Sequence, residues 1–298
     1  MAKVLVTGAT GLLGTSLVPF LQEHGHHVIR IGNTRIADLN ADLTSLEQTV
    51  QVLDHARPDF IIHLAALTNV DRCETHPQEA YLLNVKTVEN LCAWIKISDQ
   101  ACHLIHISTD QVYNGTGQNK ENELTICNFY AMSKLASEFV AGTVPSTILR
   151  TNFVGRSKCE GRASLTDWLY GVLTDKIEAN VFDDVMFSPL VISTLCSYID
   201  HCIVNRPLGI FNLGSRNGMS KADFAFAFAA ALGLEANHLK RVHASSNRTL
   251  IAHRPTDMRM NCDRFEACIG ASLPLLKDEI YRAADEYLRT NASSAKSI

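Results

Sequence analysis

The chain alternates short runs of consecutive apolar residues with longer segments in which apolar residues recur every three or four positions. The alternation is most regular in the first half. Apolar runs without polar alternation are typical of strands that helices cover on both faces. The expected strands are 4–6, 28–31, 60–64, 104–107 and 146–149, and the expected helices are 12–22, 46–55, 77–97 and 130–140. This order predicts an α/β fold with a doubly wound parallel sheet.

The pattern loosens after residue 150. Helices are expected at 164–175, 194–204, 220–232 and 276–288, with short strands near 180–182 and 209–213. We therefore expect a sheet domain over residues 1–150 and a smaller lobe, mainly over 151–290, with some segments returning to the sheet. The polar residues 291–298 are expected to form a flexible tail.

Composition narrows the class of protein. With 298 residues, of which 46% are hydrophobic and 19% charged, the chain has enough apolar material for a large core. A net charge of −4 argues against a nucleic-acid partner, which would favour clustered Lys and Arg. No apolar run approaches the ~20 residues that span a bilayer. Neither a membrane partner nor a cleavable leader is expected, and a cytoplasmic location is predicted.

A glycine-rich turn follows the first strand and opens the first helix. Three glycines at intervals of three suit a tight turn, close approach to a pyrophosphate and tight packing of helix on strand. The helix N-terminus adds free N–H groups for an anion. The turn residues predicted to bind a dinucleotide are Gly8, Thr10, Gly11, Leu12, Leu13 and Gly14. Residues 1–150 are thus predicted to form an NAD(P)-binding Rossmann domain.

The end of the second strand is expected to select the cofactor. NAD-binding proteins usually carry Asp or Glu there to bond the ribose hydroxyls. Residues 31–35 contain no carboxylate, whereas Asn33 and Arg35 are present and Arg30 is close by. A 2′-phosphate would be better tolerated than a bare ribose. The sequence therefore predicts NADPH, with NADH left open.

A hydroxyl, a tyrosine and a lysine form the candidate catalytic group. Thr109 ends the fourth core strand, and Tyr130 and Lys134 lie one helical turn apart on the next helix. A free tyrosine has a pKa of ~10, and a neighbouring ammonium is expected to lower it. Thr109 can bond a carbonyl oxygen on which negative charge develops. This combination predicts proton transfer to a ketone, with Lys134 also holding the nicotinamide ribose.

These motifs together resemble the extended short-chain dehydrogenases/reductases, and more narrowly the dTDP-4-dehydrorhamnose reductase family. The matching segments are VLVTGATGLLG (4–14), AALTNVDRCE (65–74), AYLLNV (80–85), STDQVYNG (108–115), YAMSKLASE (130–138), ILRTNFVG (148–155) and Arg254-Pro255. The resemblance implies NADPH-dependent reduction of a nucleotide-linked 4-keto-6-deoxysugar, and it makes the second lobe substrate-binding. It also makes Thr109, Tyr130 and Lys134 the catalytic residues.

The resemblance further implies which residues contact the two ligands. Besides the turn, the cofactor contacts are Asp42, Leu43, Ala65, Ala66, Thr68 and Asn84. The sugar-nucleotide contacts are Asp110, Gln111, Val112, Asn152, Phe153 and Arg254. The family usually has an aromatic residue at Gln111 and often tryptophan at Phe153, so the identity of the sugar is left open. No metal is expected, and a homodimer is left open.

Two other functions fit the same residues. One is a regulatory subunit without catalysis, similar to the beta subunit of methionine adenosyltransferase, although an intact Thr109, Tyr130 and Lys134 set favours an enzyme. The other is a sugar-nucleotide epimerase, in which Cys127, three residues before Tyr130, would act on the sugar. All nine cysteines lack CxxC spacing, and burial among apolar residues is the prediction for most of them.

Overall fold

The computed structural model describes residues 1–33, 37–246 and 250–295, with the backbone alone from 290 onward. Its centre is a seven-stranded sheet in the order β11-β6-β5-β4-β1-β2-β3, parallel at every pair. The strands are β1 (Lys3–Thr7), β2 (His27–Gly32), β3 (Leu39–Asn40), β4 (Phe60–His63), β5 (His103–Thr109), β6 (Ser146–Thr151) and β11 (Gly209–Leu213). The strand order reverses between β1 and β4, which is where such folds bind ligands. The predicted Rossmann-type sheet is confirmed.

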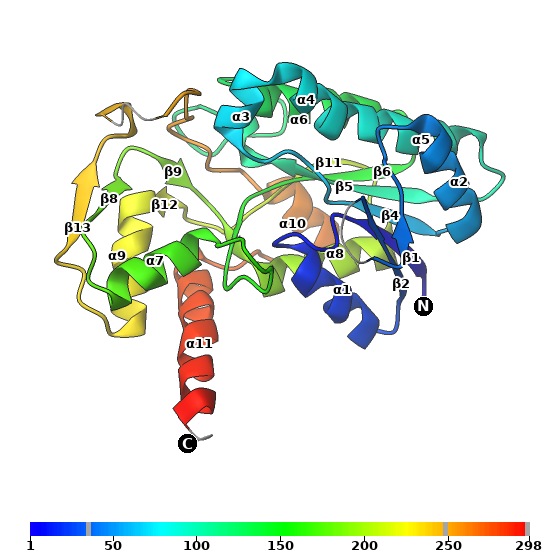
Figure 1. Cartoon of the computed structure of the whole chain (residues 1–298). Coiled ribbons are helices and arrows are strands. Elements are labelled where there is room, and N and C mark those ends of the chain that lie inside the picture. Colours follow the sequence, from blue (N-terminus) through cyan, green and yellow to red (C-terminus); the bar gives the residue numbers. More distant parts are fainter. Residues whose placement is uncertain (34–36, 247–249, 296–298) are drawn as a thin grey trace.

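Helices cover both faces of the sheet (Figure 1). One face carries α1 (Gly14–Glu23), α8 (Ile192–Asn205) and α10 (Asp263–Ile269). The other carries α2 (Leu46–Ala56), α5 (Thr87–Ile97) and α6 (Phe129–Ala141). Fully buried side chains such as Leu5, Leu17 and Leu53 fill the space between the layers. Burial on both faces explains why the strands contain apolar runs without alternation.

A second hydrophobic core lies beside the sheet and is built from later residues (Figure 1). Its helices are α7 (Leu165–Thr174), α9 (Lys221–Leu232) and α11 (Leu276–Ala295). Its short strands pair as β8 (Ala179–Phe182) with β13 (Leu239–Val242), β9 (Met186–Phe187) with β12 (Met219–Ser220), and β7 (Phe153–Val154) with β10 (Leu190–Val191). β11 meanwhile extends the main sheet. The division into domains at residue 150 stays a prediction.

The segment predicted as one helix from 77 to 97 contains a π turn. It begins as α4 (Pro77–Tyr81), widens at η1 (Leu82–Lys86) and continues as α5. A short helix before it, α3 (Val70–Thr75), was not predicted. π turns are rare and cluster at functional sites. Here the turn directs Asn84 toward the loop that precedes α3.

The tail predicted at 291–298 overlaps the last helix, and its flexibility stays a prediction. α11 continues to Ala295, and residues 296–298 lie outside the described residues. The sequence between Leu288 and Ala295 contains neither glycine nor proline, so nothing in it stops the helix. Within the described residues, no helix is both long and apolar enough to cross a membrane.

Candidate active site

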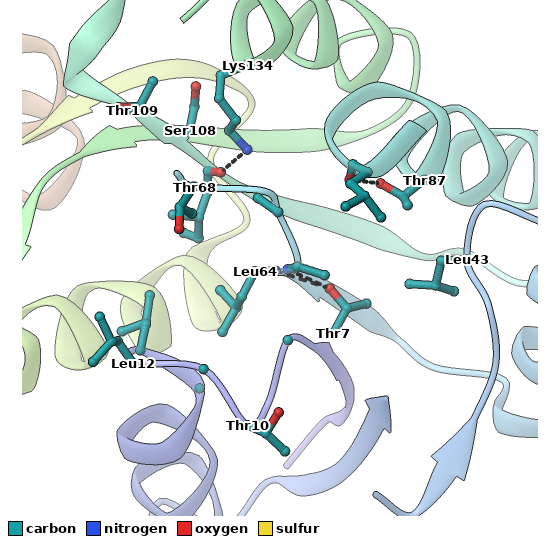
Figure 2. A pocket seen from close by; sticks show the side chains of 18 of the residues that line it. Thr7, Thr10, Leu12, Leu43, Leu64, Thr68, Thr87, Ser108, Thr109 and Lys134 are labelled. Carbon is teal, nitrogen blue, oxygen red and sulfur yellow. Dashed lines mark hydrogen bonds between the residues drawn. The ribbon is translucent and has the colours of Figure 1, made fainter. Parts of the chain in front are cut away.

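A cavity of about 570 Å³ opens at the carboxyl ends of the central strands, at the point where the strand order reverses. The sequence-predicted residues that line it are Gly8, Thr10, Gly11, Leu12, Leu13, Gly14, Asn33, Asp42, Leu43, Ala65, Ala66, Thr68, Thr109, Asp110, Gln111, Tyr130, Lys134, Asn152 and Phe153. Figure 2 shows Thr10 and Leu12 toward one end, and Thr109 and Lys134 toward the other. Residues predicted from separate motifs therefore meet in one cavity.

The glycine turn forms one end of the cavity and requires glycine at positions where a side chain would not fit. Gly8 has φ +66°, and a Cβ there would lie 2.8 Å from the backbone N of Ala65. A Cβ on Gly14 would lie 2.4 Å from the carbonyl oxygen of Gly8. No side chain caps the start of α1 at Leu13; the N–H groups of Thr15, Ser16 and Leu17 donate to the carbonyl oxygens of Gly11 and Leu13, and residues 11–14 line this end of the cavity. This arrangement fits a pyrophosphate.

Thr7 ties the turn to the next strand. Its hydroxyl accepts hydrogen bonds from the backbone N–H groups of Leu64 and Ala65, each at 3.2 Å, so its own proton points to Nδ1 of His63 at 2.8 Å. Burial lowers the pKa of His63 to about 3, with Lys134 acting in the same direction. A neutral ring with an accepting Nδ1 follows. These bonds fix the start of the loop that carries Ala65, Ala66 and Thr68.

Asn84 does not line the cavity, contrary to the prediction that it contacts the cofactor. Its side chain is buried, accepts from the N–H of Leu67 at 2.7 Å and donates to Ser133 of α6 at 2.9 Å. The π turn at η1 is what brings it there. Asn84 therefore supports, from outside the cavity, the loop that carries Ala65, Ala66 and Thr68.

The structure changes the interpretation of Arg30, which lies on β2 and was considered a possible partner for a 2′-phosphate. Asp38 accepts from the backbone N–H of Arg30 at 2.8 Å and forms an ion pair with its guanidinium at 2.7 Å. A carboxylate is therefore present beside β2, seven residues after Ile31, and Arg30 already has a partner. Asn33 and Asp42 line the cavity, while Arg35 lies outside the described residues.

The catalytic end is assembled where β5 ends and α6 begins. Asn128 caps α6, accepting from the N–H of Ala131 at 2.8 Å, and this sets Tyr130 in the first turn. The Tyr130 hydroxyl is hydrogen-bonded to Thr109. Lys134 donates to the carbonyl oxygen of Ile107 at 2.8 Å (Figure 2). All three predicted catalytic side chains thus lie at one end of the cavity.

The charges at this end differ from the expectation for Tyr130. Burial raises the pKa of Tyr130 well above its ordinary value, the Thr109 hydrogen bond opposes this, and nearby Asp110 adds to it. Burial lowers the pKa of Lys134 to about 8, while Glu138 acts in the opposite direction. Because the ammonium points to a backbone carbonyl, it does not lower the tyrosine pKa in this arrangement.

A buried ion pair holds the catalytic helix against the sheet. Arg150 of β6 contacts Glu138 of α6 at 2.6 Å, and both side chains are at most 1% exposed. Glu138 also accepts from Ser108 of β5. Arg150 donates further to the hydroxyl of Tyr113 at 2.7 Å. The network joins β5, β6 and α6 directly behind Thr109 and Lys134.

Asp110 is the buried acid in the part of the cavity predicted to bind substrate. It accepts from the amide of Asn152 at 2.7 Å, and burial raises its pKa to about 6 against that hydrogen bond. Gln111 and Phe153 line the cavity nearby. Val112, predicted to contact substrate, instead belongs to the hydrophobic core and is 0% exposed. The tight turn after β5 directs Asp110 and Val112 to different sides.

Arg254 also lies away from the cavity lining. It forms an ion pair with Asp71 of α3 at 2.9 Å, and Asp71 accepts from the N–H groups of Ile251 and Ala252. Two matching segments about 180 residues apart in sequence therefore meet in space. The contact fixes the 251–254 loop over α3, beside the substrate side of the cavity.

Two cations at or near the cavity are absent from the site residues predicted from the sequence. Lys221 begins α9, its ammonium lies 6.0 Å from the ring centroid of Phe187, and its charge interacts with those of Asp110 and Arg254. A cation at a helix N-terminus is unfavourable, and this was an available signal that Lys221 has another purpose. Arg162 lines the cavity from a loop and had no signal, because isolated loop arginines are usually surface charges.

A doubly wound sheet with a glycine turn at its switch point, and a Tyr-x-x-x-Lys pair beside it, defines an NAD(P)-dependent oxidoreductase of the short-chain dehydrogenase/reductase type. The model of the RmlD substrate binding domain matches residues 2–289. The chain belongs to that family.

Named relatives differ in function. The spore coat polysaccharide biosynthesis protein SpsK of Bacillus subtilis is 31% identical over 79% of this chain and 81% of its own. The dTDP-4-dehydrorhamnose reductase of Escherichia coli is 27% identical over 97% of this chain and 99% of its own. Methionine adenosyltransferase 2 subunit beta of Xenopus laevis is also 27% identical, over 91% and 84%.

Solved structures agree with the fold. The dTDP-4-dehydrorhamnose reductase of Bacillus anthracis, in complex with NADP, gives a TM-score of 0.86 at 23% identity and covers 96% of this chain and 99% of that one. A hypothetical dTDP-4-dehydrorhamnose reductase from Sulfolobus tokodaii gives 0.80 at 29% identity, covering 91% and 96%.

Proposed function

We propose that the protein is an NADPH-dependent reductase of a nucleotide-linked 4-keto-6-deoxysugar. The observation that carries the proposal is the cavity itself, which has an uncapped glycine turn toward one end and the Thr109–Tyr130 pair toward the other. The nicotinamide cofactor, when bound, supplies the hydride. Relatives that reduce dTDP-4-dehydrorhamnose support the substrate class.

The side chains divide the work between the two ligands. The turn and the start of α1 bind the pyrophosphate, and Asp42 and Leu43 lie along the adenosine. Thr109 and Tyr130 donate hydrogen bonds to the ketone oxygen, and Tyr130 gives up its proton as the oxygen becomes a hydroxyl. Lys134 donates one N–H to Ile107 and lies 3.5 Å from Nε2 of His106, which leaves at least one N–H for a ribose hydroxyl. The raised tyrosine pKa keeps the proton on Tyr130 until the oxyanion develops.

NADPH is proposed as the cofactor, with NADH accepted. The NADP complex of the Bacillus anthracis relative supports this preference. Because Arg30 is already paired with Asp38, it does not explain a preference for NADPH. Asn33 and the end of β2 are therefore the residues proposed to select the cofactor.

The test is reduction of a substrate panel. Purified protein is mixed with NADPH and the 4-keto-6-deoxysugars of dTDP, UDP, GDP and CDP, and cofactor absorbance is followed. We expect oxidation of NADPH with at least one sugar nucleotide, dTDP-4-keto-6-deoxy-L-mannose first. No oxidation above a Tyr130→Phe control with any of the four would overturn the proposal.

A regulatory subunit is the second candidate function. The equal identity to methionine adenosyltransferase 2 subunit beta and to the Escherichia coli reductase favours keeping it. Capture of a synthetase partner, together with no turnover on the panel, would establish it. The epimerase reading loses support, because Cys127 is not among the described residues that line the cavity. The homodimer and the cytoplasmic location stay predictions.

A further inference from the structure

The loop of residues 155–163 lies against the glycine turn. It follows β7 and ends at Ser164, which caps α7. Cys159 is 7% exposed, and its thiol donates to the carbonyl oxygen of Thr10 at 3.0 Å. A loop from the second half of the chain is thereby held directly on the turn that is proposed to bind pyrophosphate.

The first part of this loop is fixed by several hydrogen bonds. The N–H of Arg156 donates to Glu286 at 2.7 Å, and the N–H of Ser157 donates to Asp167 at 3.1 Å. The chain then turns, with Gly161 at φ +71° and the N–H of Arg162 bonded to the carbonyl oxygen of Cys159 at 3.3 Å. This turn sets the direction in which Arg162 leaves the loop.

Arg162 is a cation without a counter-ion in the cavity. It lines the cavity, and its guanidinium forms no ion pair or hydrogen bond with the described residues. The other charged residues among the described cavity lining are Asp42, Asp110 and Lys134. Lys134 lies at the catalytic end and already donates to Ile107. A polyanionic ligand at the turn would therefore meet only neutral N–H groups, were it not for Arg162.

We propose that Arg162 binds the pyrophosphate of the dinucleotide cofactor, completing the glycine turn from the 155–163 loop. The inference rests on the proposed function, because it requires a dinucleotide in this cavity. A guanidinium presents paired N–H donors that match the oxygens of a phosphate, and charge-assisted bonds of this kind are stronger than those of backbone N–H groups alone. Neutral N–H groups shape the site, and Arg162 supplies its charge.

Lys158 provides a matched control on the same loop. It lines a separate hollow next to the turn, together with Thr10, Arg30 and Glu160, and it is absent from the main cavity. Lys158 and Arg162 are both exposed cations. Replacing either one with glutamine changes the net charge of the protein by the same amount, so a difference between the variants reports position and not overall charge.

The experiment measures the dissociation constants of NADPH, NADH and ADP-ribose for wild type, Arg162→Gln, Arg162→Lys and Lys158→Gln at one ionic strength. We expect Arg162→Gln to weaken all three ligands about tenfold, Arg162→Lys to lose less, and Lys158→Gln to stay within twofold. Equal dissociation constants in wild type and Arg162→Gln would overturn the inference. Loss confined to NADPH would also overturn it, because that pattern places Arg162 on the 2′-phosphate.

Failure of this inference can be told from failure of the proposed function. If wild type binds none of the three ligands, both the proposed function and the inference are refuted. If wild type binds NADPH and Arg162→Gln binds it equally well, only the inference falls. Unchanged thermal midpoints of both loop variants exclude unfolding as the cause of weaker binding.

Discussion

The two ends of the cavity are formed by different kinds of groups, backbone at one end and polar side chains at the other. At the glycine end the structure relies on backbone: Gly8 and Gly14 stand where any Cβ would meet a main-chain atom within 3 Å. At the catalytic end it relies on buried polar side chains, among them Tyr130, Lys134, Asp110 and Glu138, each at most 8% exposed. In the proposed function, the glycine end binds through its shape, its N–H groups and Arg162, whereas the chemistry relies on groups that are costly to bury.

This difference predicts where substitutions harm binding and where they harm turnover or stability. Backbone-built sites fail when a side chain is added, because the main chain cannot move aside cheaply. A site formed by side chains loses its function when a functional group is removed. Some of the buried charges in such a site also destabilise the fold. The catalytic end should therefore contain positions at which stability and activity respond in opposite directions.

The largest expected effect is at Tyr130. The Tyr130→Phe variant keeps the ring and loses the proton donor, so kcat should fall by about 10²–10⁴-fold. NADPH oxidation with the best substrate of the panel measures it. Turnover within tenfold of wild type would mean that another group donates the proton.

The second effect concerns the network behind the catalytic helix. Glu138→Gln leaves Arg150 buried without its counter-charge, and the free energy of unfolding should fall by about 3–5 kcal/mol. Urea unfolding measures the change. Glu178→Gln is the matched control, since Glu178 pairs with Lys240 at the same 2.6 Å but both side chains are more than half exposed. The control should change far less, because solvent screens an exposed ion pair, and equal losses would refute the role of burial.

The third effect is a gain in stability at Asp110. Its folded pKa of about 6 lies above the ordinary 3.8, so the folded state binds the extra proton and stability falls as pH rises between these values. Asp110→Asn should therefore be more stable than wild type at pH 8, by about 1–3 kcal/mol, with the gain vanishing near pH 4. Activity should drop in the same variant. A gain that persists unchanged at pH 4 would contradict the explanation.

The smallest effect concerns the contact between Asp71 and Arg254. Asp71→Asn weakens a half-buried ion pair, and unfolding free energy should fall by about 1 kcal/mol. Because the 251–254 loop lies beside the substrate side, KM for the sugar nucleotide should rise while kcat changes little. Asp99→Asn, in an exposed pair with Arg57, serves as the control. A kcat loss as large as that of Tyr130→Phe would place Arg254 in the chemistry.

The sequence predicted the glycine end better than the rest, for a physical reason. The turn is a local feature, since a strand, three glycines and the start of a helix, all within residues 4–14, are enough to specify it. The spacing of Tyr130 and Lys134 is equally local. Motifs of this kind involve residues that are close together in sequence, so they can be recognised without knowing the fold.

The residues that were missed or misplaced depend on contacts between distant segments. Asn84 was predicted to contact the cofactor, but it supports a loop instead, because a π turn rotates it toward Leu67. Arg254 meets Asp71 across about 180 residues. Arg162 lines the cavity from a loop whose Cys159 donates to the carbonyl oxygen of Thr10, in the first half of the chain. None of these pairings follows from hydrophobic periodicity, which reports the face of an element and not its neighbour.

The most direct test compares binding at the two ends. NADPH is titrated into wild type, Gly14→Ala and Tyr130→Phe, with Gly117→Ala, whose added Cβ would meet nothing within 4 Å, as the control. We predict that Gly14→Ala weakens NADPH binding at least tenfold, whereas Tyr130→Phe and Gly117→Ala bind within about twofold of wild type. Normal binding by Gly14→Ala, or loss of binding by Tyr130→Phe equal to that of Gly14→Ala, would contradict the separation of binding from chemistry.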